Sequence, residues 1–246
     1  MKLFIDSANL GDIEEALGEG LACGITTNPS LLAKEPKANY LGHMKKIVDI
    51  ARAHGGTASL SIEVFSDEPS EMLTQAAEFV KELNYEPLAI KIHISHKGKN
   101  NLGIIKNLAK KGIRVNCTAC MTPLQLAMAA AAGATYISLF YNRLRDSGTE
   151  EKFAAPRETL LKEKAVEQSD FNPDTVLRET RDLIANYPRA EIIAGSIRSV
   201  TDVKRASLAG AHIVTASLKV LRQALLHYKT DESVEGFFKD FAAWLK

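Results

Sequence analysis

The bulk composition of this chain excludes several classes of protein. Its 246 residues carry a formal net charge of +1 and 46% of them are hydrophobic, so the chain can bury a sizeable core but has no overall field to steer nucleic acid or a membrane surface. It has no apolar run of about eighteen residues and reaches a charge too early for a secretory signal, so we expect a cytoplasmic protein with no membrane or nucleic-acid partner.

Short β-branched runs that end in polar residues recur along the chain, and each is followed by a longer stretch of helical periodicity. The expected strands are residues 3–6, 24–28, 60–64, 88–93, 114–118, 136–140, 191–196 and 212–217. Eight such units predict an α/β fold, a single (β/α)8 TIM barrel over residues 1–246. A doubly wound open sheet is the alternative, but the glycine-rich first turn that usually marks it does not occur in the sequence.

Two stretches lie outside the eight-fold scheme. Residues 144–174 are charged and contain Pro156 and Pro173, so we expect a partly helical insertion that is either a solvated excursion or a lid over the barrel mouth. Residues 231–246 predict an extra amphipathic C-terminal helix with an aromatic stripe. That stripe must be covered either by the chain's own barrel or by a neighbouring subunit.

The side chains that close each predicted strand are the candidates for function, because catalytic groups in a TIM barrel stand at the C-terminal ends of the strands. They are Asp6, Thr26, Asn28, Glu63, Lys91, Asn116, Thr118, Ser138, Phe140, Ser196 and Arg198, with Arg143 just beyond the sixth strand.

Lys91 is the most informative of these residues, because it interrupts the apolar run LAIKIHI and is expected to point into the barrel or its mouth. One interpretation is a lysine paired with a carboxylate for stability, and the other is a desolvated amine that attacks a carbonyl. Asp6 and Glu63 end two other strands. Two carboxylates beside a strand lysine favour proton transfer, which both Schiff-base formation and carbon–carbon cleavage require.

The remaining candidates fit a sugar with an anionic group. Asn28, Asn116, Thr118 and Ser138 either satisfy backbone groups at the strand ends or supply the neutral donors and acceptors that a polyol needs. Arg198 follows Ser196 near the expected start of a helix, where hydroxyl, guanidinium and helix N-terminus together form an anion site. Arg143, which follows the sixth strand, is either a second arginine of this anion site or a lone surface arginine without a functional role.

Seven segments of the sequence, in order and over nearly the whole chain, resemble the transaldolases and their relatives, the fructose-6-phosphate aldolases. The segments are LFIDSAN at 3–9, GITTNPS at 24–30, SIEV at 61–64, IKI at 90–92, NCT at 116–118, SLFYNR at 138–143 and AGSIR at 194–198. The resemblance implies a class I aldolase-like barrel, an enzyme of carbohydrate metabolism such as the pentose phosphate pathway, no metal or organic cofactor, and a homo-oligomer assembled through the C-terminal helix.

The same resemblance implies a role for each candidate residue. Lys91 would be the Schiff-base nucleophile, Asp6 the acid and base for carbon–carbon cleavage, and Glu63 with Thr118 the pair that manages a catalytic water. The other candidates would bind substrate: Asn28, Asn116 and Ser138 would hold the hydroxyls of the dihydroxyacetone unit, and Arg143, Ser196 and Arg198 would receive a phosphate. Thr26 and Phe140 would be further substrate-binding residues.

Two features bear on the substrate and the reaction. Where the family usually has a proline two residues after the lysine, this chain has His93, and the basic loop that follows contains His96, Lys97 and Lys99. Phenylalanine at 140 and glutamate at 63 favour a transferase, since the aldolases carry tyrosine and glutamine there. The alternatives are a lyase that releases free dihydroxyacetone, a variant enzyme for an unusual sugar such as a sulfosugar, and a non-catalytic sugar-binding barrel.

Overall fold

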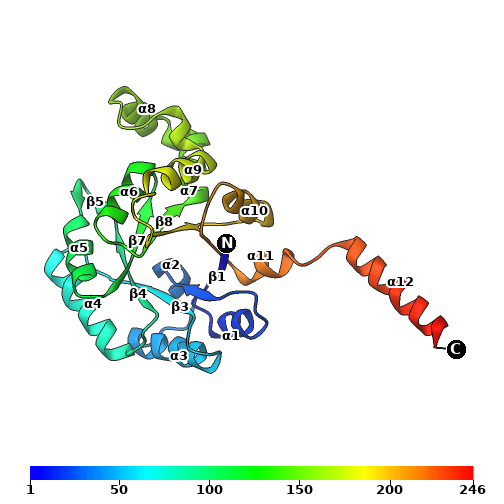
Figure 1. Ribbon diagram of the computed structural model, residues 1–246. Coiled ribbons are helices and arrows are strands. Elements are labelled where there is room, and N and C mark those ends of the chain that lie inside the picture. Colours follow the sequence, from blue (N-terminus) through cyan, green and yellow to red (C-terminus); the bar gives the residue numbers. More distant parts are fainter. Residues whose placement is uncertain (246) are drawn as a thin grey trace.

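Eight parallel strands close into a barrel in the computed structural model, which describes residues 1–245 (Figure 1). The strands are β1 (Lys2–Asp6), β2 (Gly24–Thr26), β3 (Ser59–Glu63), β4 (Leu88–His93), β7 (Arg114–Cys120), β8 (Tyr136–Phe140), β9 (Glu191–Gly195) and β10 (Ile213–Ala216). They pair in the order β1-β10-β9-β8-β7-β4-β3-β2, so the last strand closes on the first. The predicted TIM barrel is confirmed.

Helices follow the strands and cover the outside of the barrel (Figure 1). They are α1 (Leu10–Gly18), α3 (Tyr40–Ala53), α4 (Pro69–Leu83), α5 (Leu102–Lys110), α6 (Pro123–Ala131), α7 (Tyr141–Thr149), α9 (Pro173–Leu183), α10 (Val200–Leu208) and α11 (Leu218–Gln223). The short helix α2 (Pro29–Leu32) lies instead over the open end of the barrel, after the C-terminal end of β2 (Figure 1). Several of these helices begin with a side-chain cap, as in α6, where the Thr122 side chain accepts a hydrogen bond from Gln125 N and Pro123 occupies the first turn.

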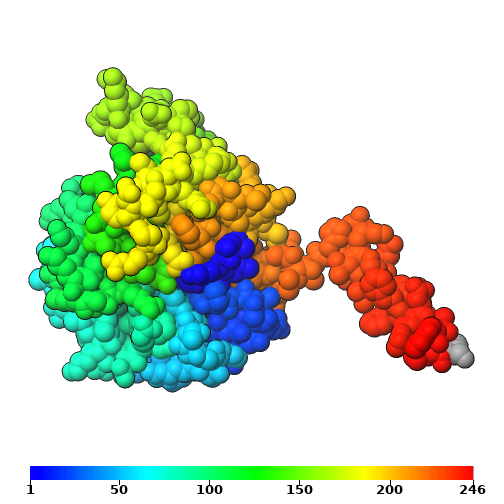
Figure 2. All heavy atoms as spheres, in the orientation of Figure 1, coloured from blue at the N-terminus to red at the C-terminus, as the bar shows by residue number. Residues whose placement is uncertain are grey.

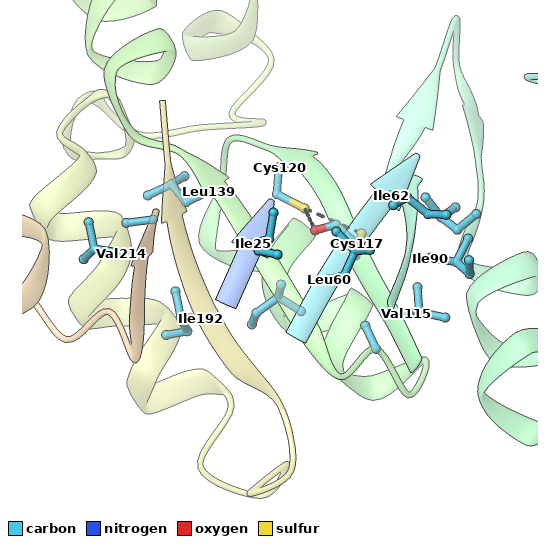
Figure 3. Packing of buried hydrophobic residues seen from close by; sticks show 14 of the residues in the cluster. Ile25, Leu60, Ile62, Ile90, Val115, Cys117, Cys120, Leu139, Ile192 and Val214 are labelled. Carbon is cyan, nitrogen blue, oxygen red and sulfur yellow. Dashed lines mark hydrogen bonds between the residues drawn. The ribbon is translucent and has the colours of Figure 1, made fainter. Parts of the chain in front are cut away.

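Two apolar clusters give the barrel its shape. The larger one fills the space between the outer faces of the strands and the helices, and Figure 3 shows Ile25, Leu60, Ile62 and Ile90 within it. The smaller one lies inside the barrel, because side chains alternate between the two faces of each strand. We call it the barrel floor; its members are Phe4, Ala89, Tyr136, Ile193 and Ile213.

The floor requires a glycine on the neighbouring strand. A Cβ atom at Gly24 would stand 2.4 Å from Cε1 of Phe4, well inside van der Waals contact. The Phe4 ring, which is 2% exposed, therefore occupies the volume that a larger residue on β2 would need.

The segment between β8 and β9 divides into a packed and a projecting part. α7 buries Tyr141, Asn142 and Leu144 against the barrel. Beyond it come η1 (Glu151–Phe153), α8 (Ala154–Lys162) and η2 (Gln168–Phe171), and every residue of α8 is at least partly exposed. In Figure 1 α8 projects from the barrel.

The C-terminal helix α12 (Tyr228–Trp244) points away from the barrel, as the red segment of Figures 1 and 2 shows. The extra helix was predicted, and it begins three residues earlier than expected. Phe237, Phe238 and Trp244 are 67%, 70% and 78% exposed. The chain's own barrel therefore does not cover the aromatic stripe. Among residues 1–245, no helix is both long enough and apolar enough to cross a bilayer.

Candidate active site

A cavity of about 340 Å³ opens at the C-terminal ends of the strands. We call it the mouth cavity, and it brings together all of the predicted site residues except Arg198. They are Asp6, Thr26, Asn28, Glu63, Lys91, Asn116, Thr118, Ser138, Phe140, Arg143 and Ser196. None of the insertion, residues 144–174, is among the described residues that line it.

A second hollow of about 400 Å³ lies at the opposite end of the barrel, around the N-terminal ends of β7, β8 and β9. Arg114, Tyr187 and Arg189 line it, together with small and apolar residues. Among the described residues, its lining has no carboxylate, lysine, histidine or cysteine. Of these two cavities, only the mouth cavity therefore brings a lysine and carboxylates together.

Lys91 lies on β4 with its side chain inside the barrel and only 7% exposed. Its Nζ donates hydrogen bonds to the Thr27 carbonyl and to Glu63 Oε2, both at 2.8 Å. Glu63 is its in-register neighbour on β3, which explains why the two side chains meet. A buried ion pair is a poor way to gain stability over an apolar pair, but it gives the amine a carboxylate that can take its proton.

Asp6 ends β1 and accepts a hydrogen bond from Thr26 on β2, which in turn contacts Thr215 on β10. Thr26 Oγ1 donates to Asp6 Oδ1 at 2.7 Å and lies 2.6 Å from Thr215 Oγ1. Burial raises the pKa of the Asp6 carboxyl above its ordinary value. The hydrogen bond from Thr26 and the positive charges of Lys91 and Arg143 lower this pKa, but their effect is smaller than that of burial. This environment favours a carboxyl group that can carry a proton.

A chain of neutral groups crosses the cavity from β3 to β8. Ser138 Oγ donates to Asn116 Oδ1 at 2.6 Å, and Asn116 Nδ2 donates to Ser61 Oγ at 3.1 Å. All three side chains are buried. Because each holds the next, the amide of Asn116 has a fixed orientation towards a ligand.

Asn28 combines a structural contact with a place in the cavity. Its Oδ1 accepts a hydrogen bond from Leu31 N at 3.1 Å, which caps α2. The capping contact uses the oxygen, so the amide nitrogen is the group left for a ligand.

The backbone is strained at two points on the cavity wall. Ala119 follows Thr118 in an irregular part of β7 and has a φ of 61°, and Ser196 after β9 has a φ of 60°. Residues with a Cβ avoid this region, and such outliers gather at functional sites. Asn142, fully buried on α7, supports the second point by donating to the Ser196 carbonyl at 2.7 Å.

Of the two predicted anion-binding arginines, the cavity includes only Arg143. The Arg143 guanidinium lies 4.6 Å from the centre of the Phe140 ring, in a cation–π arrangement. The Arg198 guanidinium instead binds both carboxylate oxygens of Asp146 on α7, with Nη1 to Oδ1 at 3.0 Å. Its side chain is 53% exposed, and the ion pair holds the pKa of Asp146 below its ordinary value.

Three groups that hydrogen-bond to the predicted site residues were not anticipated: the Thr27 carbonyl, Ser61 and Thr215. The signal for the last two was present in the alternation of the strands. Ser61 stands two residues before Glu63, and Thr215 two residues after Ile213 of the floor, so both share the inward face. The carbonyl of Thr27 could be found only from the fold.

Fold and site together define a TIM barrel whose cavity is built around a strand lysine and two carboxylates. The sequence model of the family described as Transaldolase/Fructose-6-phosphate aldolase matches residues 3–245. The chain belongs to this family of enzymes.

Its relatives match over nearly their whole length. A probable transaldolase of Caldicellulosiruptor saccharolyticus is 36% identical, over 98% of this chain and 97% of the relative. A probable transaldolase of Alkaliphilus metalliredigens is 35% identical over both full lengths, and probable transaldolase 2 of Bacillus anthracis is 37% identical over 98% of each chain.

Proposed function

We propose that this protein is a transaldolase-type transferase, which moves a dihydroxyacetone unit from a ketose to an aldehyde through a Schiff base on Lys91. One observation carries the proposal: Lys91 Nζ lies 2.8 Å from Glu63 Oε2 in the wall of the mouth cavity. An amine in this position has a carboxylate to accept its proton and open space beside it for a sugar.

The covalent step begins when the freed amine adds to the ketose carbonyl carbon and water leaves, which gives an iminium on Lys91. Asp6 then takes the proton from the hydroxyl group next to the scissile bond, and the carbon–carbon bond breaks towards the iminium. The first aldehyde departs and the enamine remains. When the acceptor aldehyde adds, Asp6 returns the proton, a task that suits a carboxyl whose pKa is raised by burial.

Substrate recognition divides between two parts of the cavity. Asn28, Asn116 and Ser138 supply neutral hydrogen-bonding groups for the hydroxyls of the transferred unit. Arg143 and Ser196 receive the anionic end of a sugar phosphate or similar acidic sugar. Arg198 can bind the same anion only after its ion pair with Asp146 breaks. It therefore contributes less to the free energy of substrate binding than an arginine without such a partner.

Transfer is favoured over release because the Phe140 ring places no hydroxyl in the cavity to hold a water near the enamine carbon. The test is to incubate fructose 6-phosphate with and without an acceptor aldehyde and to follow the three-carbon unit by mass spectrometry. Transfer should greatly exceed release, and Phe140→Tyr should raise release. If the wild-type enzyme frees dihydroxyacetone as fast as it transfers it, the enzyme is a lyase.

The exposed stripe on α12 fits a homo-oligomer in which the helix packs against another copy of the chain. Phe237, Phe238, Phe241 and Trp244 together form an apolar surface that a monomer would leave in water. Sedimentation equilibrium tests this, and a monomer at micromolar concentration would contradict it.

A further inference from the structure

His93 closes β4 two residues beyond Lys91, so its side chain lies on the same inward side of the strand and one layer nearer the mouth. The two neighbouring strands carry Thr118 and Glu63, two polar residues that line the mouth cavity. On β7 the in-register partner of His93 is Thr118, and on β3 the partner of Lys91 is Glu63. His93 therefore lies above Lys91, with the strands of Glu63 and Thr118 on either side.

Two polar atoms at this place lack partners. His93 Nε2 and Thr118 Oγ1 are both buried, and neither has a hydrogen-bond partner among residues 1–245. Thr118 as a whole is 1% exposed. Buried polar groups are nearly always paired with protein or water, and a bound water needs two to four such partners. A hydroxyl and a ring nitrogen on adjacent strands provide two of them, and Glu63 provides a third.

The main chain at His93 is held in place from both sides. Its carbonyl accepts a hydrogen bond from Nδ2 of Asn101, a buried residue, at 2.9 Å. Ile94 N, one residue further on, donates to the Thr118 carbonyl at 3.0 Å and keeps β4 and β7 together. The backbone around Nε2 is thus fixed before a ligand arrives.

The charged and titratable groups that face His93 are Glu63, His96 and Asp67. The His96 ring stands edge-on at 6.1 Å between centroids, and its Nδ1 lies 3.2 Å from Asp67 Oδ2. Burial lowers the pKa of His93 below its ordinary value, and this outweighs the opposing attraction of Glu63. A neutral ring has one donor and one acceptor nitrogen, as a water ligand requires.

We propose that His93 is a positioning residue, which together with Thr118 and Glu63 binds the water that leaves and re-enters at the Lys91 Schiff base. This inference rests on the proposed function. Glu63 takes one proton from the Lys91 ammonium, and the amine forms the nitrogen–carbon bond. A second proton moves from nitrogen to the carbinolamine oxygen. Glu63 then delivers its proton to that oxygen, the carbon–oxygen bond breaks and water departs. His93 stays neutral throughout and orients the departing or entering water.

The experiment follows the exchange of the ketose carbonyl oxygen with H₂¹⁸O, because each cycle of Schiff-base formation and hydrolysis replaces that oxygen. Fructose 6-phosphate is incubated with enzyme, without acceptor, and its ¹⁸O content is measured by mass spectrometry. His93→Phe keeps a ring without hydrogen-bonding groups and should slow exchange about tenfold through kcat, with little change in KM. His93→Gln, which restores an amide donor and acceptor, should recover most of the rate.

His212→Gln is the matched control, since His212 is a second half-buried histidine with a pKa lowered by burial, at the opposite end of the barrel. His212 Nδ1 accepts a hydrogen bond from Ile192 N at 2.9 Å, so this variant should lower Tm but leave exchange unchanged. Thr118→Val supplies an independent measurement. If both side chains hold one water, the His93→Phe/Thr118→Val double variant should exchange little more slowly than either single variant.

The outcomes separate the two proposals. If His93→Phe exchanges oxygen as fast as the wild-type enzyme, the proposed role of His93 is wrong, whereas the Schiff base on Lys91 still stands. Fully additive losses in the double variant also overturn it. A wild-type enzyme that exchanges no oxygen above the uncatalysed background, and forms no reducible adduct, contradicts the proposed function itself.

Discussion

The floor and the mouth of this barrel are built from the same strands and differ completely in chemistry. β1 contributes Phe4 to the floor and Asp6 to the mouth cavity, and β4 contributes Ala89 and then Lys91. A step of two residues, about 6.6 Å along a strand, separates a close-packed apolar layer from a network of hydroxyls, amides and charges. The floor residues are all buried, so this apolar layer separates the polar groups above it from the other end of the barrel.

The two layers also differ in how they affect the stability of the folded protein. In the floor, all five side chains are buried, and the Phe4 ring lies so close to Gly24 that even a Cβ atom there would collide with it. The mouth contains a buried ion pair, positive φ at Ala119 and Ser196, and a carboxyl with a raised pKa. Each of these features is unfavourable or neutral for stability, which is the pattern expected where a site has been kept for chemistry. Substitutions in the floor should therefore reduce stability, and substitutions in the mouth should reduce activity.

The largest effect is expected for Asp6→Asn. Transfer should fall about 10²- to 10⁴-fold, because an amide cannot move the proton during carbon–carbon cleavage, whereas an adduct should still form on Lys91. Stability at pH 7 should be equal or higher. A raised pKa means that the folded state disfavours the carboxylate, so the penalty is complete above the folded pKa and asparagine removes it. Steady-state kinetics and urea titration measure both quantities; an active, destabilised variant would place Asp6 with the structural residues.

Phe4→Ala should have the opposite effect: it should lower stability and leave the chemistry at Lys91 intact. Removal of a fully buried ring typically costs about 3–5 kcal/mol of unfolding free energy, and the loss should appear as a lower urea midpoint. The folded fraction at low temperature should still trap a ketose on Lys91. A variant with wild-type stability but no adduct would show that the floor shapes the site directly. It would contradict the division between a floor that provides stability and a mouth that provides activity.

Gly24→Ala tests the close approach between β2 and the floor. The added methyl group meets the Phe4 ring, and overpacking of this kind costs about 1–3 kcal/mol. Because the two residues share one volume, Gly24→Ala combined with Phe4→Leu should be less destabilised than the sum of the two single variants. Additive losses in such a double-mutant cycle would argue that the ring and the methyl group do not compete.

The smallest effect concerns the two histidines at opposite ends of the barrel. Burial lowers the pKa of both His93 and His212 below the ordinary value of 6.5. In each case the unfolded chain binds the proton more readily, so the stability that the neutral ring contributes is present above pH 6.5 and is lost as the pH falls through the folded pKa. Both rings are partly exposed, which keeps each contribution below about 1 kcal/mol. Urea midpoints at several pH values should fall less with acid in His93→Gln and His212→Gln than in the wild type.

The sequence predicted the barrel and most of the cavity lining for a common physical reason. Buried parallel strands leave a strong apolar signal, and a polar residue at the end of such a strand is conspicuous, as Lys91 and Glu63 are. Thr215 and Ser61 were missed because a small hydroxyl inside an apolar strand looks like ordinary variation. The partner of Arg198 could not be predicted, since Asp146 on α7 lies 52 residues away in the sequence and meets it only through the fold. The direction of α12 could not be predicted, since an amphipathic pattern indicates a helix but not what its apolar face packs against.

The central claim, that Lys91 is the covalent nucleophile of this barrel, is tested most directly by borohydride reduction. The enzyme is incubated with fructose 6-phosphate or free dihydroxyacetone, reduced, digested and mapped by mass spectrometry, with Lys91→Met treated in parallel. The account predicts a stable adduct on the peptide that contains Lys91 and none on folded Lys91→Met. An adduct on another lysine, or one of equal yield in Lys91→Met, would contradict it.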